Sequence, residues 1–285
     1  MVQRALVLGA GGHAAAAWEI GLITGLSESG VDVRNADLFV GTSAGARVAV
    51  QITAGLTLEE LFQRQIDPRR QQTEAPPGVD WRSLRGEFTR AKEGGGGEKE
   101  ILRRFGTVAL TGAKGPASER KQFIEGQLPV HTWPEQKLLI ATVEAEAGER
   151  RVFDRASGID LIDAVTASGA VAGIWPAVEF AGRHYFDGGF YSTDNADLAI
   201  GSERVLIAAL RAGSPPLAVR SLGDAVERLR SSGARVEVVH PDEATEAAYA
   251  AVGGNLLDPA VCEPAALAGR AQGERIAGQI AGLWY

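Results

Sequence analysis

The chain has 285 residues and a mass of 29.9 kDa, and its 36 acidic side chains against 29 Lys and Arg give a formal net charge of −7. This acidic balance argues against a dedicated nucleic-acid-binding protein, which usually presents a basic face. The single cysteine, Cys262, excludes an intrachain disulfide and a cysteine-rich zinc site. Gly and Ala together make up 82 of the 285 residues, so the placement of the glycines needs a structural explanation.

The first residues alternate between two kinds of segment. Arg4–Leu8 and Asp37–Val40 are short apolar runs that predict buried strands. Each is followed by a glycine cluster and then by a segment of helical composition, Ala14–Leu26 and Ala46–Leu56. Strand, helix, strand and helix in this order favour an α/β fold with a parallel sheet.

The segment 64–100 has a different composition. It is polar, Pro76 and Pro77 interrupt it, and the run Gly94–Gly97 ends it. These features predict helix ends and a surface excursion. We favour a flexible loop here, and a lid over a site is the alternative.

The rest of the chain returns to alternating elements. The sequence predicts strands at 137–143, 151–154, 184–187, 204–210 and 236–239, and helices at 159–168, 222–231 and 265–282. Asp194 and Asp197 are expected to cap the helix that follows them. We expect one domain over residues 1–285.

No segment indicates targeting or membrane insertion. The longest uncharged windows are shorter than a transmembrane helix, and the apolar run at the N-terminus is too short for a signal peptide. We therefore expect a cytoplasmic location, with peripheral contact at a membrane as a further expectation. The sequence does not indicate an oligomeric state.

A candidate nucleophile lies in the second glycine cluster. Gly41–Gly45 matches G-x-S-x-G with Ser43 at its centre, between a predicted strand and a predicted helix. A serine on such a turn has an exposed hydroxyl, and the helix N-terminus beyond it can stabilise an oxyanion. The strand-turn-helix context favours Ser43 as a nucleophile over an ordinary turn serine.

A serine nucleophile needs a base, and the residues alone leave two candidates. His240 follows a strand, as the histidine of an α/β-hydrolase triad does, but Ser43 comes too early in the chain for that fold. Asp187 ends a predicted strand and is followed by two glycines, so a carboxylate could accept the serine proton directly.

The first glycine cluster, Gly9–Gly12, also has two interpretations. Its backbone N–H groups can form an anion-binding nest that serves Ser43 as an oxyanion hole. It also matches the dinucleotide fingerprint, with Asp32 as the ribose ligand. A dinucleotide site would leave the G-x-S-x-G turn unexplained.

These three motifs in this order resemble the patatin-like phospholipases, in an actinobacterial-type branch. Trp18–Gly21 and Gly173–Pro176 are similar to that branch too, and the resemblance covers about residues 4–210. It implies a three-layer α/β/α sandwich with a mainly parallel sheet. It also implies a Ser–Asp dyad without histidine, and hence a lipid acyl hydrolase that cleaves lipid or carboxyl esters through an acyl-enzyme, with no cofactor.

Carried over residue by residue, the resemblance makes Ser43 the nucleophile and Asp187 its base. The backbone N–H groups of Gly11 and Gly12, together with that of Ala44, would form the oxyanion hole. No nucleic-acid partner is expected, and no His or carboxylate cluster has metal-ligand spacing.

The sequence departs from the family pattern in several places. Ala10, Ala14 and Ala15 stand where the family has a glycine, a basic residue and a further glycine. Arg47 is a cation close to the nucleophile and, with His13 of the glycine turn, is a tentative substrate-binding residue. A weakly active or inactive binding protein on the same scaffold is the alternative function, besides dinucleotide binding.

Overall fold

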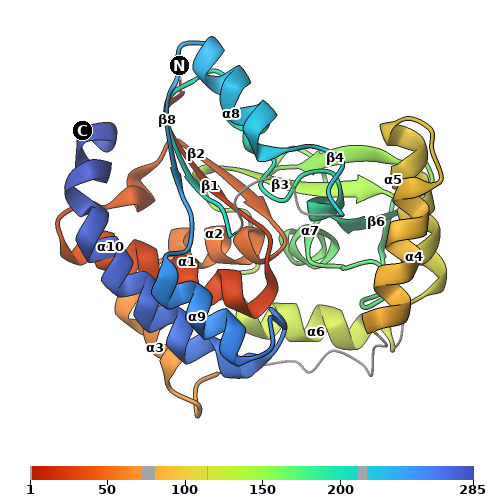
Figure 1. The fold of residues 1–285 in the computed structure, drawn as a ribbon, viewed down its shortest axis with the longest axis horizontal. Helices are drawn as coiled ribbons and strands as arrows, with labels where there is room; N and C mark the ends of the chain where they lie inside the picture. Colours follow the sequence, from red (N-terminus) through yellow and green to blue (C-terminus); the bar gives the residue numbers. More distant parts are fainter. Residues whose placement is uncertain (1, 72–80, 114, 211–216) are drawn as a thin grey trace.

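In this computed structural model the chain is described at residues 2–71, 81–113, 115–210 and 217–285. Within these residues, eight strands form one mixed sheet at the centre of the molecule (Figure 1). The strands are β1 (Val2–Leu8), β2 (Leu38–Thr42), β3 (Lys137–Glu144), β4 (Glu149–Phe153), β5 (Val178–Phe180), β6 (Arg183–Asp187), β7 (Ser202–Ala208) and β8 (Arg235–Val239).

The strand order is β5-β6-β3-β2-β1-β7-β8, with β4 also paired to β3, and β3, β2, β1, β7 and β8 run parallel. The α-helices are α1 (Gly12–Glu28), α2 (Ala44–Thr53), α3 (Leu58–Ile66), α4 (Trp81–Glu93), α5 (Glu98–Thr111), α6 (Ala117–Gln127), α7 (Leu161–Ser168), α8 (Leu222–Ser231), α9 (Glu243–Ala251) and α10 (Cys262–Trp284).

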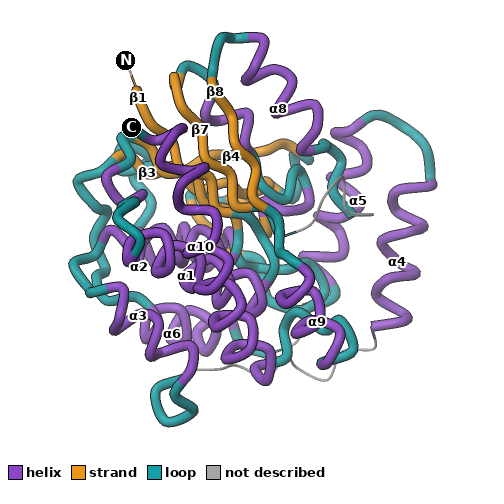
Figure 2. Tube along the Cα trace, turned by 60° about the vertical axis from the view of Figure 1, so that its left-hand side comes forward, coloured by secondary structure: helices purple, strands orange, loops and turns teal. Residues whose placement is uncertain are grey.

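Helices cover both faces of the sheet. Leu6 and Leu8 of β1 pack with α1, α2 and α10, whereas Ala5 and Val7 pack with α8 on the opposite face. Figure 2 shows the strands between these two helix layers. Because a strand covered on both sides needs no polar face, all of β2 is buried. The predicted three-layer α/β/α fold with a mainly parallel sheet is confirmed.

The register of β3 places the ends of two other strands next to each other. Ile140 of β3 pairs with Gly41 of β2 on one edge and with Phe153 of β4 on the other. Two residues farther along β3, Thr142 pairs with Asp187 of β6. This pairing is on the edge that β2 occupies, because β4 occupies the other edge. Strands β2 and β6 therefore follow one another along the same edge of β3, and the residues just after β2 meet the last residue of β6.

Close contact between α1 and α10 accounts for part of the glycine content (Figure 1). A Cβ atom added at Gly25 of α1 would lie 2.0 Å from the carbonyl oxygen of Arg270, and one added at Gly273 of α10 would lie 2.3 Å from that of Leu22. Both distances are far shorter than any real Cβ contact. The two helix backbones can approach this closely only because glycine lacks a side chain at these positions.

The flexible loop expected within residues 64–100 is wrong at residues 81–93, which form a helix. Helix α4 occupies residues 81–93, and Gly94–Gly97 is only a short connection to α5. Leu84 and Phe88 of α4 are buried at helical spacing, and Phe88 packs edge-on against Phe105 of α5 with ring centroids 5.6 Å apart. These few apolar residues suffice to form a helix in a polar segment. The prolines Pro76 and Pro77 lie outside the described residues.

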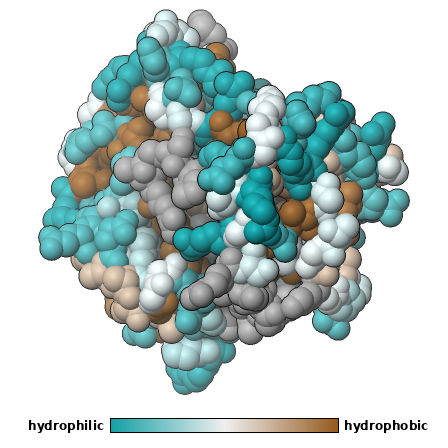
Figure 3. Space-filling model, turned by 45° about the vertical axis from the view of Figure 1, so that its right-hand side comes forward, coloured by the Kyte–Doolittle hydropathy of each residue, from teal (hydrophilic) through white to brown (hydrophobic). Residues whose placement is uncertain are grey.

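Among the described residues, no helix is both long enough and apolar enough to cross a bilayer. The face shown in Figure 3 is mainly hydrophilic, with hydrophobic residues in separate small areas.

Two glycines of α10 give a matched test of the helix contact. Gly273→Ala should lower the free energy of unfolding by about 1–3 kcal/mol, because the new methyl group collides with the backbone of α1. Gly278→Ala lies on the same helix with nothing within 4 Å, and should raise it by about 0.5–1 kcal/mol through helix propensity. Urea unfolding of both variants measures the difference, and equal effects would contradict the close packing.

Candidate active site

Ser43 lies on a strained turn between β2 and α2. Its backbone angles are φ 56° and ψ −115°, a conformation that residues other than glycine rarely adopt and that costs of order 1–3 kcal/mol. The glycines on either side make the turn possible. A Cβ at Gly45 would lie 2.1 Å from the carbonyl oxygen of Leu8, and one at Gly41 would lie 2.5 Å from Ala46 Cα.

A buried serine that the sequence did not single out fixes this turn. The backbone N–H of Ser43 donates to Ser168 Oγ at 2.8 Å, and the Ser168 hydroxyl donates to the carbonyl oxygen of Ala141 at 2.7 Å. Ser168 ends α7, and Ala141 belongs to β3. These hydrogen bonds link the strained turn to α7 and β3. A costly backbone conformation persists when the surrounding structure holds it in this way. A serine at a helix end gives no signal in the sequence that would reveal this role.

Asp187 lies beside Ser43, as the register of β3 requires. The Ser43 hydroxyl, as a hydrogen-bond donor, acts to lower the pKa of the Asp187 carboxyl, and the Gly189 amide donates to Asp187 Oδ1 at 2.7 Å. Burial raises the pKa of Asp187 to about 6, although both hydrogen bonds act to lower it. A carboxyl group with a pKa near neutrality can take a proton from an adjacent hydroxyl and return it later.

Asn195 holds the loop that follows Asp187. Its side-chain amide donates to Thr42 Oγ1 at 3.0 Å and to the carbonyl oxygen of Ser192 at 2.7 Å. It therefore connects the residue before Ser43 with the loop after Asp187. The expected caps nearby are wrong. Asp197 forms a bidentate ion pair with Arg150, at 2.7 and 2.8 Å, instead of capping a helix.

The glycine turn lies directly against the nucleophile turn. The amide of Gly45 donates to the carbonyl oxygen of Gly9 at 3.0 Å. Gly11 and Gly12 have φ of 155° and 63°, so this stretch needs glycine. Gly12 and Ala44 begin α1 and α2, and the first amides of a helix have no acceptor within it. The residues expected to form the oxyanion hole thus lie at the start of two helices that meet at Ser43.

The alanines in the glycine turn fit without strain. Among the described residues other than glycine, positive φ occurs only at Ser43, Ala181 and Asn195, so Ala10 has an ordinary backbone. The Ala10 amide donates to the carbonyl oxygen of Thr193 at 2.8 Å. Ala15 is fully buried within α1.

Two buried carboxyl groups lie behind the turn. Gly9 donates its amide proton to Glu19 Oε1 at 2.9 Å, and Asp194 Oδ1 lies so close to Gly9 that a Cβ there would be 2.6 Å away. Burial raises the pKa of Glu19 well above its usual range and that of Asp194 to about 6. Asp194 was expected to cap a helix. It instead packs against the first glycine of the turn, which explains why no side chain fits at that position.

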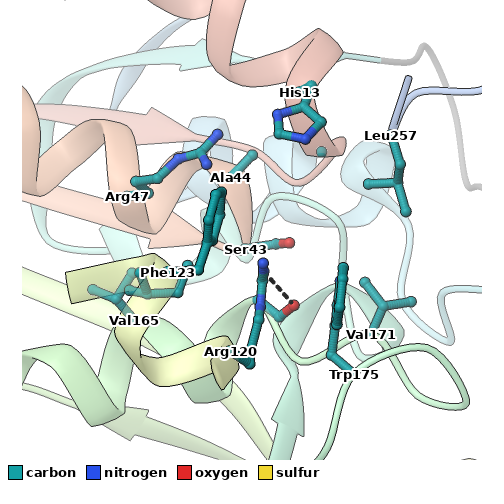
Figure 4. A pocket seen from close by; sticks show the side chains of 13 residues that line it. His13, Ser43, Ala44, Arg47, Arg120, Phe123, Val165, Val171, Trp175 and Leu257 are labelled. Carbon is teal, nitrogen blue, oxygen red and sulfur yellow. Dashed lines mark hydrogen bonds between the residues drawn. The ribbon is translucent and has the colours of Figure 1, made fainter. Parts of the chain in front are cut away.

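Two cavities open at Ser43. The larger, about 520 Å³, is lined mainly by apolar side chains and also by Asp187, Gly11 and Gly12; its apolar residues include Ile174, Phe190, Leu210, Leu217, Leu256 and Leu257. The smaller, about 60 Å³, lies between α2 and α6 and is shown in Figure 4. Ser43 therefore lines both a large, mainly apolar cleft and a small adjoining pocket whose polar side chains are cationic.

The small pocket contains cations. Arg47 and His13, both expected to bind substrate, line it, and so does Arg120 of α6, which the sequence did not single out (Figure 4). The Arg120 guanidinium stacks on the ring of Trp175 at 4.5 Å and lies 5.4 Å from that of Phe123. In a helix of mixed polar residues nothing distinguishes Arg120 from a solvated surface cation.

The geometry disfavours the two alternative chemistries. The His240 ring bonds to the carbonyl oxygen of Ala209 at 2.9 Å and lines none of the cavities at Ser43. Asp32 precedes β2, whereas the glycine turn follows the parallel strand β1, so the two lie at opposite ends of these neighbouring strands. A dinucleotide site needs both at the carboxyl ends of the strands. Across the described residues, no group of three or more His, Cys, Asp or Glu is placed to hold a metal ion.

Solved structures similar to this chain include VipD from Legionella pneumophila, with 14% identity and a TM-score of 0.41 over 73% of this chain and 50% of that one. The type III effector protein ExoU matches with 15% identity and a TM-score of 0.37, over 95% and 53% of the two chains. This chain therefore spans about half the length of either protein. A comparison with curated protein sequences finds no match.

A family model described as patatin-like phospholipase matches residues 6–200. This range covers well over half of the chain and includes the glycine turn, Ser43 and Asp187. The resemblance inferred from the three motifs is confirmed, and the chain belongs to the patatin-like phospholipase family.

Proposed function

We propose that this protein is a lipid acyl hydrolase that cleaves ester bonds with a Ser43–Asp187 dyad. The observation that carries the proposal is the placement of Ser43 beside the buried Asp187 carboxyl, where β2 and β6 end on the same edge of β3 and both residues line one mainly apolar cleft. Family membership supports lipid esters as the substrate class. The apolar lining supports an acyl chain as the group that the cleft binds.

In the first half of the proposed reaction, Ser43 Oγ attacks the ester carbonyl carbon while Asp187 accepts the hydroxyl proton. The carbonyl oxygen becomes negative, and amides of Gly11, Gly12 and Ala44 stabilise it at the positive ends of α1 and α2. The bond to the alcohol oxygen then breaks, the alcohol leaves with the proton from Asp187, and the acyl group remains on Ser43.

In the second half, water attacks the acyl-enzyme and Asp187 accepts its proton. The bond to Ser43 Oγ breaks, the proton returns to that oxygen, and the free acid leaves. A pKa of about 6 suits Asp187 to both halves, because it ionises near neutral pH and still holds a proton briefly.

Substitutions at the dyad test this assignment. Ser43→Ala and Asp187→Asn should each lower kcat/KM for a short p-nitrophenyl ester by about 10³-fold or more, because each removes a group that acts in both halves of the reaction. A fluorophosphonate probe should label Ser43 in the wild type, located by mass mapping of the peptide. His240→Ala is the control and should keep most of the activity. Full activity of folded Ser43→Ala would contradict the dyad.

The pH profile reports on the base. Since Asp187 must be ionised to accept a proton, kcat/KM should be constant above about pH 7 and fall about tenfold per pH unit below pH 6. Hydrolysis of a neutral p-nitrophenyl ester from pH 4.5 to 9 measures this profile. A profile that stays flat to pH 5 would exclude Asp187 as a base with a raised pKa.

The same carboxyl should make the fold pH-sensitive. Because the pKa of Asp187 is higher in the folded than in the unfolded chain, its contribution to stability is present below about pH 4 and is lost as pH rises through 6. Asp187→Asn cannot ionise, so relative to wild type it should gain about 2 kcal/mol between pH 4.5 and pH 8. Urea unfolding at both pH values measures the gain, and comparing the two pH values cancels the effect of the amide itself. A loss in place of the gain would refute the raised pKa.

A further inference from the structure

The small pocket beside Ser43 differs from the rest of the molecule in charge. The chain carries a net charge of −7, yet the residues that line this pocket include Arg47, Arg120 and His13 and no acidic side chain. A neighbouring cavity shares Arg47 and His13, adds Arg64 and Arg70, and is likewise lined by no Asp or Glu. Four arginines therefore line these two adjoining pockets in an acidic protein, whereas the larger cleft is lined by one exposed arginine, Arg85, and by the buried Asp187.

The two arginines of the pocket are held in place from different elements. Arg120 belongs to α6, stacks on Trp175 and donates to the carbonyl oxygen of Gly169 at 3.4 Å, the dashed line in Figure 4. Arg47 lies in the first turn of α2, where the helix dipole adds to its positive charge. In Figure 4 the two guanidinium groups lie on either side of the Ser43 turn.

Two carboxyl groups near these cations lie behind the turns that form the site, Glu19 of α1 and Asp187 at the end of β6. The charge of Arg120 acts to lower the pKa of Asp187, and that of Arg47 acts to lower the pKa of Glu19, in both cases against the effect of burial. Both carboxyls are buried, and neither lines the small pocket. An anion in the pocket would therefore face the arginines and stay apart from the carboxylates.

The size of the pocket limits the anion that it can hold. At roughly 10–15 Å³ for each water-sized group, a volume of about 60 Å³ holds roughly four to six non-hydrogen atoms. A phosphate group has about this size, whereas an acyl chain needs the larger cleft. Arginine is also the side chain best suited to phosphate recognition, because its planar guanidinium presents paired donors.

We propose that Arg47 and Arg120 form a phosphate site that selects acyl esters with a phosphate on the alcohol side. The inference rests on the proposed function, since it assigns the acyl chain to the apolar cleft and the phosphorylated alcohol to the small pocket. The substrate class is then an acylated glycerol phosphate or a related phospholipid, with the charged group bound next to the bond that breaks. Binding energy for the phosphate would orient the ester toward Ser43.

Two short esters of matched structure test the selection. Hydrolysis of 1-hexanoylglycerol 3-phosphate and of 1-hexanoylglycerol is compared below the concentrations at which either forms micelles. The phosphorylated ester should have a kcat/KM about 10- to 100-fold higher, as charge-assisted hydrogen bonds allow. Arg47→Gln and Arg120→Gln should each reduce this ratio by about tenfold or more, and the ratio cancels any effect of the substitution that is common to both esters. Arg228→Gln on α8 removes the same charge from an exposed position and should leave the ratio unchanged.

Binding without turnover separates this inference from the proposed function. Calorimetric titration with glycerol 3-phosphate should give a saturable signal that glycerol does not give, with Kd raised about tenfold or more in both arginine variants. If no ester is hydrolysed but this binding is found, the acyl hydrolase proposal fails and the phosphate site remains. Equal kcat/KM for the two esters, or a preference that survives both arginine substitutions, would overturn the phosphate site.

Discussion

One edge of strand β3 determines where the chemistry can occur. Strand β2 pairs with the first part of this edge and β6 with the rest, and because they run in opposite directions their C-terminal ends meet. Ser43 follows the one strand and Asp187 ends the other. A strand cannot shift its register in a sheet without turning its side chains to the other face. The register of β2 and β6 on β3 therefore fixes the relative position of Ser43 and Asp187, which are 144 positions apart in the chain.

Close approach of backbones is the second requirement, and glycine meets it at two distant places. In the site, Gly45 lets α2 reach the end of β1, which brings the glycine turn and the nucleophile turn together. At the helix layer, Gly25 and Gly273 let α1 and α10 pack with their backbones in contact. Helix α1 begins at the glycine turn, so its packing against α10 also positions this turn, which is hydrogen-bonded to the Ser43 turn. The stability of the helix pair and the geometry of the site are thus connected through one helix.

The charges of the site are arranged by depth. The carboxyls of Asp187, Glu19 and Asp194 are buried, and burial shifts their pKa upward, so this region favours bound protons. The arginines Arg47 and Arg120 lie nearer the surface, along the small pocket. A negatively charged ligand would be attracted by the outer cations, and an uncharged acyl chain by the apolar cleft. In the proposed binding mode, the acyl chain of an ester therefore occupies the larger cleft and its phosphate the small pocket.

The sequence by itself determined most of the elements and the dyad candidates. Alternating apolar runs and glycine turns predict β1, β2 and the helices after them because these signals are local: strand periodicity, helix composition and turn chemistry. The G-x-S-x-G turn identifies Ser43 for the same reason, since its strain and its close contacts need those glycines. The choice of Asp187 over His240 could not be made from local pattern and depended on the family resemblance.

Tertiary structure alone decided which distant side chains share the site. Ser168, Asn195 and Arg120 act through hydrogen bonds or ring contacts with residues far away in the chain, and their neighbours in sequence do not distinguish them. Helix α4 was missed because its few buried residues matter only once α5 packs against them. The sequence predicts a helix cap at Asp194, because the contact of this residue with Gly9 forms only when the sheet brings the two segments together. Local propensities depend on residues that are neighbours in the sequence. Burial and long-range contacts arise only when the sheet brings distant strands and loops together.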